Sequence, residues 1–292
     1  MDEQSLQGKV ILLTGANSGI GKETALALSR MGASLVLICR NESKGKETMR
    51  EIEKRTGNRS VELIVADLLL QEEVRKVASN FLSNHLRLDV LINNAGTNFP
   101  SYGETKDGVE RTMAVNYFAP FLLTNLLLDV LIRSGPSRVV NVSSVGHFRG
   151  RIELENLTRD KRMGASGLGA YGRSKLALVL FTYELARRLK GKTVTANCLH
   201  PGAVRTNIWN HAGAVTPISR LMSLFMKGAE EGARTSIYLA SSPEVEGVSG
   251  KYFEDCKQTS SSKESYNESL ASKLWEASAR ITNLSQASTL ST

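Results

Sequence analysis

The stretch VILLTGANSGIG, residues 10–21, decides the fold. Its first part, Val10–Thr14, is an apolar run typical of a buried strand, and a helical pattern covers Ile20–Met31. A glycine-rich turn between a strand and a helix N-terminus forms an anion site, because backbone N–H groups and the helix dipole both face the ligand. We therefore expect the turn to cradle the pyrophosphate of a dinucleotide, through Gly15, Asn17, Ser18, Gly19, Ile20 and Gly21.

The glycine spacing is GxxxGxG, which departs from the commoner GxGxxG fingerprint, and ordinary turns also use glycine. Gly15 suits the tight turn, Gly19 lets the backbone approach the pyrophosphate, and Gly21 lets the helix pack on the strand. The strand before the turn and the helix after it favour the dinucleotide site over an ordinary turn.

Apolar runs alternate with amphipathic helical patterns through the first two thirds of the chain. The runs lack polar alternation, which is typical of strands covered on both faces of a parallel sheet. We therefore predict an α/β fold with a doubly wound parallel sheet, formed by a single domain over 1–292 whose core is about 8–254. The expected strands are Val10–Thr14, Leu35–Cys39, Leu63–Ala66, Val90–Asn93, Val139–Val142 and Val194–Leu199, and the expected helices are Ile20–Met31, Ser43–Thr56, Glu72–Asn84, Gly108–Ile132 and Tyr171–Lys190.

Other stretches interrupt this alternation. Gly146–Gly169 is polar and glycine-rich, which predicts a loop insertion. A last amphipathic helix is expected within 264–284, and 285–292 is expected to be a disordered tail. Residues 203–228 read as a substrate flap that excludes water, with an ordinary core helix or a membrane-dipping surface as alternatives; its apolar residues are Ile208, Trp209, Leu221, Leu224, Phe225 and Met226.

The composition narrows the class of protein. Lys and Arg number 37 against 29 Asp and Glu, a net charge of +8, but no basic run interleaved with aromatic residues supports a nucleic-acid partner. The three cysteines, Cys39, Cys198 and Cys256, are odd in number and far apart, so we expect a reducing compartment and no metal site.

The N-terminal sequence lacks the basic and apolar regions of a signal peptide, and no apolar run approaches the ~20 residues that span a bilayer. We expect a soluble, cytoplasmic protein. Membrane association stays open for the case that a further segment precedes residue 1.

Tyr171 and Lys175 are the first candidate catalytic residues. Four positions on a helix make nearly one turn, so both side chains point the same way. A free phenol has a pKa near ~10, and a neighbouring ammonium favours the phenolate, which makes a tyrosine usable as a general acid and base. The pair alone is a weak signal, because helices often expose a Tyr and a Lys at this spacing.

Polar residues at strand ends support the pair. Ser143 and Ser144 close one expected strand, where an open parallel sheet presents its ligand crevice, and only one hydroxyl can face that crevice. Asn116 interrupts an apolar helix and needs a partner, which a relay water or a backbone carbonyl would supply. Asn93–Gly96 and Pro201–Gly202 with Thr206 close two further strands.

These motifs together resemble the short-chain dehydrogenase/reductase family. TGxxxGxG at Thr14–Gly21, Asp67, NNAG at Asn93–Gly96, Asn116, Ser144, YxxxK at Tyr171 and Lys175, and PGxxxT at Pro201–Thr206 occur in the family's order over about residues 8–254. The resemblance implies a Rossmann fold and a hydride exchange between a nicotinamide cofactor and an alcohol/carbonyl pair.

The resemblance also implies a role for each matching residue. Tyr171 would exchange the proton, and Ser144 would position the substrate oxygen. Lys175 would bind the nicotinamide ribose and tune Tyr171, while Asn116 would hold a relay water. The cofactor would further contact Asp67 and Leu68 near the adenine, then Asn94, Ala95, Gly96, Pro201 and Gly202, and Thr206 at the carboxamide end.

Further segments, which are less specific than the catalytic motifs, resemble the retinol dehydrogenase branch; among them are His200-Pro-Gly and Gly250-Lys-Tyr-Phe253. This branch implies a lipophilic carbonyl or alcohol as substrate, allows a homodimer, and allows peripheral contact with a membrane. A steroid, a fatty aldehyde or a xenobiotic carbonyl remains an alternative substrate, and a non-catalytic NADP-binding scaffold remains an alternative function.

Arg40 predicts the choice of cofactor. In this fold an acidic residue at the end of the second strand binds the adenosine ribose and repels a 2′-phosphate. Here Cys39 and Arg40 stand at that end, with no acid in place. The guanidinium suits a phosphate, so we expect NADP(H), although an exposed charge without this role is the alternative.

Overall fold

The computed structural model describes residues 5–164, 167–202 and 228–284. One eight-stranded sheet runs through them in the order β3-β2-β1-β4-β5-β6-β7-β8. The strands are β1 (Val10–Thr14), β2 (Ser34–Cys39), β3 (Val61–Val65), β4 (Val90–Asn93), β5 (Ser137–Val142), β6 (Val194–His200), β7 (Tyr252–Glu254) and β8 (Lys257–Thr259). All neighbouring strands pair in parallel except β7 and β8, so the predicted α/β, Rossmann-like sheet is confirmed.

The strand order places the site. The chain builds β1, β2 and β3 outward in one direction and then returns to add β4 on the other side of β1. Ligands of such sheets bind at the carboxyl ends of the strands on both sides of this reversal. Here those ends are Thr14 of β1, which is followed by Gly15, and Asn93 of β4, which is followed by Asn94.

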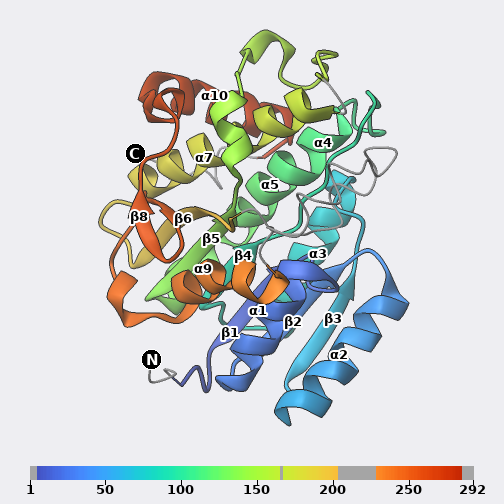
Figure 1. The fold of residues 1–292 in the computed structure, drawn as a ribbon, viewed down its shortest axis with the longest axis vertical. Coiled ribbons are helices and arrows are strands. Elements are labelled where there is room, and N and C mark those ends of the chain that lie inside the picture. Colours follow the sequence, from blue (N-terminus) through green and yellow to red (C-terminus); the bar gives the residue numbers. More distant parts are fainter. Residues whose placement is uncertain (1–4, 165–166, 203–227, 285–292) are drawn as a thin grey trace.

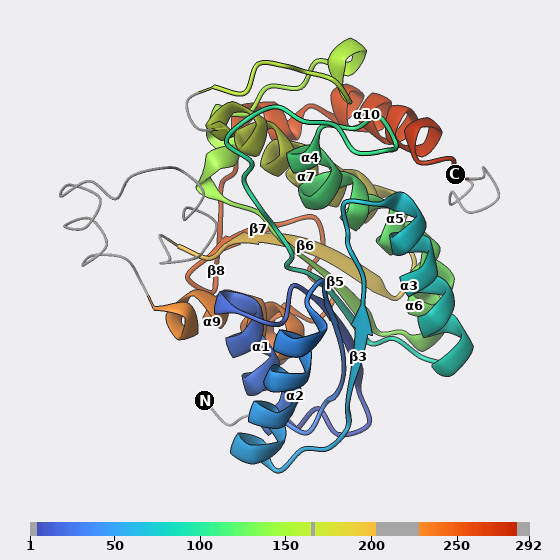
Figure 2. The same ribbon diagram turned by 90° about the vertical axis from the view of Figure 1, so that its right-hand side faces the viewer.

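Helices cover both faces of the sheet (Figures 1 and 2). On one face lie α1 (Gly19–Arg30), α2 (Glu42–Thr56) and α9 (Ala229–Ser241). On the other face lie α3 (Gln71–Asn84), α5 (Ala119–Leu126), α6 (Leu128–Ser134) and α7 (Leu168–Arg188), and α10 (Glu268–Ile281) packs against α7. Each face buries its own apolar core, and Leu12 and Leu13 of β1 point into opposite cores because strand side chains alternate.

The structure corrects the sequence prediction at the edges of the sheet. In β3 only Val61 is buried, while Glu62 and Val65 are exposed and Leu63 and Ile64 are partly buried, since this strand has a neighbour on one side alone. The prediction missed β7 and β8, which are three residues long and too short for a periodic pattern. It also missed α9, and it took Gly146–Gly169 as loop where two 3-10 turns occur, at Val145–Arg149 and Leu154–Asn156.

The helix expected over Gly108–Ile132 is broken. It begins as α4 (Arg111–Met113), continues as a π-helix over Ala114–Phe118, and bends again between α5 and α6. Within the described ranges, no single helix is long and apolar enough to cross a membrane. By length and composition alone one helix pair could, Arg111–Leu126 with Leu128–Ser134, which is bent by 55° at the break between α5 and α6.

Candidate active site

The glycine turn after β1 is closely packed against the loop after β4. Gly15 has a φ of +69°, which side chains rarely adopt, and a Cβ on Gly21 would lie 2.2 Å from the carbonyl oxygen of Gly15. The Asn94 amide Nδ2 donates to the carbonyls of Thr14 (2.9 Å) and Gly15 (3.2 Å). Therefore the two loops expected to hold a cofactor form one unit.

Thr14, at the end of β1, also links these two loops, and we did not predict this role from the sequence. Its buried hydroxyl accepts hydrogen bonds from the backbone N–H groups of Asn94 (3.0 Å) and Ala95 (2.9 Å). The signal available in the sequence was its position, because a hydroxyl residue at the carboxyl end of a central strand lies at the crevice.

The two serines after β5 have different surroundings, as the period-2 argument requires. Ser143 donates through Oγ to the carbonyl of Lys175 (3.1 Å) and serves the packing of α7. The Ser144 side chain accepts a hydrogen bond from the Gly146 N–H (3.1 Å) and is hydrogen-bonded to Tyr171. Ser144 is thus the serine that shares a site with the tyrosine.

Tyr171 lies on α7 and is 6% exposed. A Cβ on Gly146 would approach its ring to 3.2 Å, so the small residue lets the ring lie over the turn after Ser144. Burial raises the pKa of Tyr171 above its ordinary value, and the hydrogen bond with Ser144 opposes this effect. The phenol is therefore protonated at neutral pH.

Lys175 follows one turn later on α7, as expected from the spacing. Its ammonium lies 5.7 Å from the centre of the Tyr171 ring and donates to the carbonyl of Val142 (2.8 Å). Burial lowers the pKa of Lys175 to about 8. The spacing led us to expect that the Lys175 cation lowers the pKa of Tyr171. Instead, burial raises the pKa of Tyr171 and lowers that of Lys175, because desolvation acts against the charged form of both groups.

Asn116 lies within the π-helix. Pro120 has no N–H and cannot donate the hydrogen bond that the carbonyl of Asn116 would receive in an α-helix, and π-helical segments are common at functional sites. The Asn116 amide accepts from the Thr97 N–H (2.8 Å) and donates to the Thr97 carbonyl (2.9 Å) and to Ser174 Oγ (3.0 Å). Protein groups thus supply the partners that a buried asparagine needs.

Gly96 connects Asn116 with Lys175. A Cβ at this position would lie 3.3 Å from the lysine Nζ and 3.6 Å from the asparagine Oδ1. The loop after β4 therefore runs directly past both candidate catalytic side chains.

The residues expected at the adenosine end also share this edge of the sheet. Arg40 directly follows β2 and is exposed, whereas Cys39 is buried. Asp67 follows β3, accepts a hydrogen bond from the Leu69 N–H (3.1 Å), and is followed by Leu68, which packs on the core. Pro201 and Gly202 follow β6. Thr206 and the whole apolar set of the expected flap lie outside the described residues.

The described residues fit a dinucleotide. A Cβ on Gly15 or Gly21 would collide with neighbouring atoms of this turn and of the loop after β4, while nothing lies within 4 Å of the position that a Cβ on Gly19 would take. The helix α1 begins at Gly19, so its N-terminal N–H groups and dipole lie where an anion would bind. In the same described ranges, no group of three His, Cys, Asp or Glu side chains could hold a metal ion.

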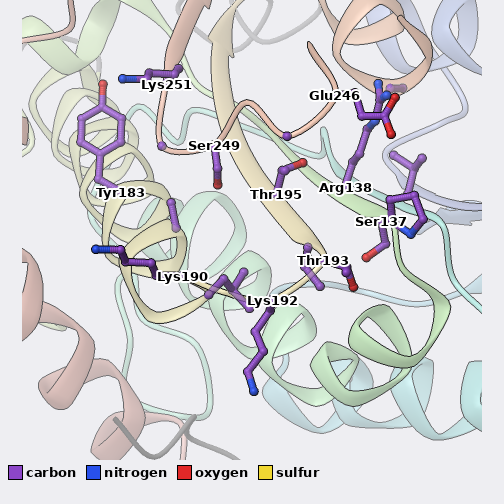
Figure 3. Close-up of a pocket in the computed structure, with 18 of the residues that line it drawn as sticks. Ser137, Arg138, Tyr183, Lys190, Lys192, Thr193, Thr195, Glu246, Ser249 and Lys251 are labelled. Atoms are coloured by element: carbon purple, nitrogen blue, oxygen red, sulfur yellow. The ribbon is translucent and has the colours of Figure 1, made fainter. Parts of the chain in front are cut away.

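A cavity of about 850 Å³ opens at the opposite, amino-terminal ends of β5 and β6. Figure 3 shows Thr193, Thr195 and Ser249 along it, with Arg138 beside Glu246 at one side. The residues that line it include none of the candidate site residues that the structure describes. We do not assign it to the substrate, because parallel sheets of this type bind ligands at the carboxyl ends.

Comparisons with known proteins agree with this geometry. The family model for short chain dehydrogenase matches residues 9–156 and 159–215. The chain is 44% identical over 279 residues to human retinol dehydrogenase 11, covering 96% of this chain and 87% of that protein. A crystal structure of an uncharacterised Mycobacterium paratuberculosis protein is 33% identical with a TM-score of 0.78, covering 97% of this chain and 96% of that one. The Pseudomonas aeruginosa RhlG/NADP active-site complex is 27% identical with a TM-score of 0.70, covering 85% and 95%.

Proposed function

The chain belongs to the short-chain dehydrogenase/reductase family, in its retinol dehydrogenase-like branch, and from this premise we propose that it is an NADP(H)-dependent oxidoreductase. Its reaction interconverts a lipophilic aldehyde or ketone with the alcohol. The observation that carries the proposal is the convergence of Ser144, Tyr171 and Lys175 beside the glycine turn, at the carboxyl edge of the sheet.

The residues divide the chemistry among them. When bound, the nicotinamide supplies or accepts the hydride. The Ser144 hydroxyl holds the substrate oxygen, and the Tyr171 phenol gives this oxygen a proton during reduction and takes it back during oxidation. Because burial raises the pKa of Tyr171, the phenol is in the form that reduction needs at neutral pH.

Lys175 and Asn116 complete the site. The buried Lys175 ammonium would hold the nicotinamide ribose while the Val142 carbonyl fixes its position. Asn116 joins the loop at Thr97 to α7 through Ser174, and it would place a relay water through its backbone carbonyl. The loop after β4 would bind the cofactor through Asn94, Ala95 and Gly96.

The preference for NADP(H) rests on Arg40. The residue is exposed at the end of β2 and can turn its guanidinium toward a 2′-phosphate, and Cys39 offers no carboxylate to repel this phosphate. The complex of the related RhlG protein with NADP supports this choice. Carbonyl reduction is then the physiological direction.

The surface beside the site supports a lipophilic substrate. Three large apolar side chains are unusually exposed close to the candidate catalytic residues: Val145 (55%) and Phe148 (53%) in the turn after Ser144, and Leu168 (41%) at the start of α7. Apolar groups of this kind typically line ligand sites. The retinol dehydrogenases among its relatives favour a retinoid or another long-chain carbonyl as the substrate.

The proposal is tested by following NADPH oxidation with a panel of aldehydes that runs from acetaldehyde to retinal. Efficiency should rise with chain length or ring number. Tyr171→Phe should lose about 10²–10⁴ in turnover and keep its affinity for NADPH. Tyr238→Phe is the matched control, because the Tyr238 hydroxyl on α9 donates to Glu244, which is not a candidate site residue. Near-normal turnover of Tyr171→Phe would mean that the mechanism is wrong.

A further inference from the structure

The turn that follows Ser144 carries a fully buried histidine, His147. One ring nitrogen, Nδ1, lies 2.6 Å from the carbonyl oxygen of Ser144. The other, Nε2, accepts a hydrogen bond from the backbone N–H of Ser262 (3.0 Å), which precedes α10 in the C-terminal part of the chain. The ring therefore bridges two segments that are far apart in the sequence.

These two partners determine which nitrogen carries the proton. A backbone N–H only donates, so Nε2 must present its lone pair to Ser262. A carbonyl only accepts, so Nδ1 must carry the hydrogen that faces Ser144. The Tyr252 hydroxyl is a more distant neighbour of Nδ1, at 3.5 Å. The neutral ring satisfies both backbone partners in one tautomer, and burial keeps the ring neutral by lowering its pKa.

The C-terminal segment that contains Ser262 also contacts the π-helix that carries Asn116. The Tyr117 hydroxyl, next to Asn116 in the π-helix, is hydrogen-bonded to Ser278 of α10 (2.7 Å). The region from Ser262 to Ser278 lies beyond the residues that the family model matches. This region therefore contacts a neighbour of each of two candidate catalytic residues: His147, which is hydrogen-bonded to Ser144, and Tyr117, which is next to Asn116 in the chain.

We propose that His147 is a positioning residue: its Nδ1–H donates to the Ser144 carbonyl and holds the backbone of Ser144 in place, while the hydrogen bond from Ser262 of the C-terminal segment keeps the proton on Nδ1. The proposal rests on the function assigned to Ser144 above. Because the ring is fully buried, we expect it to touch neither substrate nor cofactor. It acts through the Ser144 carbonyl, and a displacement of the Ser144 hydroxyl by about 1 Å can lower turnover by about a hundredfold.

Three substitutions separate the two hydrogen bonds. In His147→Asn the amide nitrogen can replace Nδ1 as the donor to Ser144, and the acceptor for Ser262 is lost. In His147→Gln the amide oxygen can replace Nε2 as the acceptor, and the donor to Ser144 is lost. His147→Phe keeps the ring and loses both bonds. His85→Asn is the control, since His85 pairs with Glu62 on the surface at the end of α3.

We expect kcat for retinal reduction to fall about ten- to a hundredfold in His147→Phe and His147→Gln, and by less than about threefold in His147→Asn and His85→Asn. The Kd for NADPH should stay unchanged in all four variants. A purely structural role would instead lower the unfolding midpoint and leave the kcat of the folded protein equal among the variants. Equal kcat values in His147→Asn and His147→Gln would therefore overturn the proposal.

A second measurement does not depend on activity. The imidazole ¹⁵N shifts of His147 in the cofactor-free protein at pH 7 should be those of a neutral ring protonated at Nδ1. A ring protonated at Nε2, or at both nitrogens, would overturn the proposal even in a fully active enzyme. A wild-type protein without reductase activity that still showed the Nδ1–H ring would refute the proposed function and leave the bridge itself supported.

Discussion

Replacing Lys175 by Met should make the protein more stable while it removes activity. The ammonium is 3% exposed, and burial lowers its pKa from the ordinary 10.5 to about 8. At ~1.4 kcal/mol for each tenfold change in the proton equilibrium, the charged form is destabilised on folding by about 3 kcal/mol. Methionine has a similar shape and no charge, and it gives up one hydrogen bond, to Val142, worth about 1 kcal/mol. The expected net gain at pH 7 is about 2 kcal/mol.

The gain should depend on pH in a defined way. Below pH 8 both folded and unfolded chains carry the proton, so the folded wild type bears the full destabilisation. Between pH 8 and 10.5 the folded state has released the proton while the unfolded state retains it, so the stability of the wild type rises with pH. The advantage of Lys175→Met over wild type should therefore shrink across this window.

The assay is urea unfolding of the cofactor-free proteins at pH 7 and pH 9.5, with Lys190→Met as the control. Lys190 is an exposed lysine just after the same helix, and its replacement should change the free energy of unfolding by less than about 0.5 kcal/mol. If Lys175→Met were no more stable than wild type at pH 7, or if its advantage were the same at both pH values, the cost assigned to the buried charge would be wrong.

Three further predictions concern the cofactor, the proton and the support of α7. Cys39→Asp combined with Arg40→Ala should abolish a preference for NADPH over NADH of roughly 10- to 150-fold in Kd, and an unchanged preference would exclude Arg40 from phosphate binding. The rate of carbonyl reduction should stay level through neutral pH, and alcohol oxidation should rise with pH, because burial raises the pKa of the Tyr171 proton donor; a reduction rate that falls between pH 7 and 8 would contradict this assignment. Asp160→Asn should lower the free energy of unfolding by about 3–5 kcal/mol, since it leaves the buried Arg173 guanidinium, now 2.6 Å from Asp160, without its counter-ion. Glu153→Gln, which removes an exposed partner of Arg162, should change it by less than about 1 kcal/mol in the same unfolding experiment.

Much of the fold could be predicted from local sequence. Six expected strands occur within two residues of their predicted bounds, because an uninterrupted apolar run has to be buried wherever it lies in the chain. The turn at Gly15–Gly21 could also be predicted from local sequence, since the positive φ of Gly15 and the contact of Gly21 with the Gly15 carbonyl involve residues that are close together in the chain. The short strands β7 and β8 could not be predicted, because they have no hydrophobic pattern of their own. They form because β7 pairs with β6 and β8 pairs with β7.

The sequence by itself determined which residue types stand at the ends of the strands, and the spacing that places Tyr171 and Lys175 on one side of a helix. Only the tertiary structure decided their electrostatics. Burial raises the pKa of Tyr171 and lowers that of Lys175, in the opposite sense to what a neighbouring cation alone would cause. The bridge from Ser144 through His147 to Ser262 was also decided there. Periodicity and backbone sterics act between near neighbours, whereas desolvation and hydrogen bonds across the fold depend on which distant segments pack together.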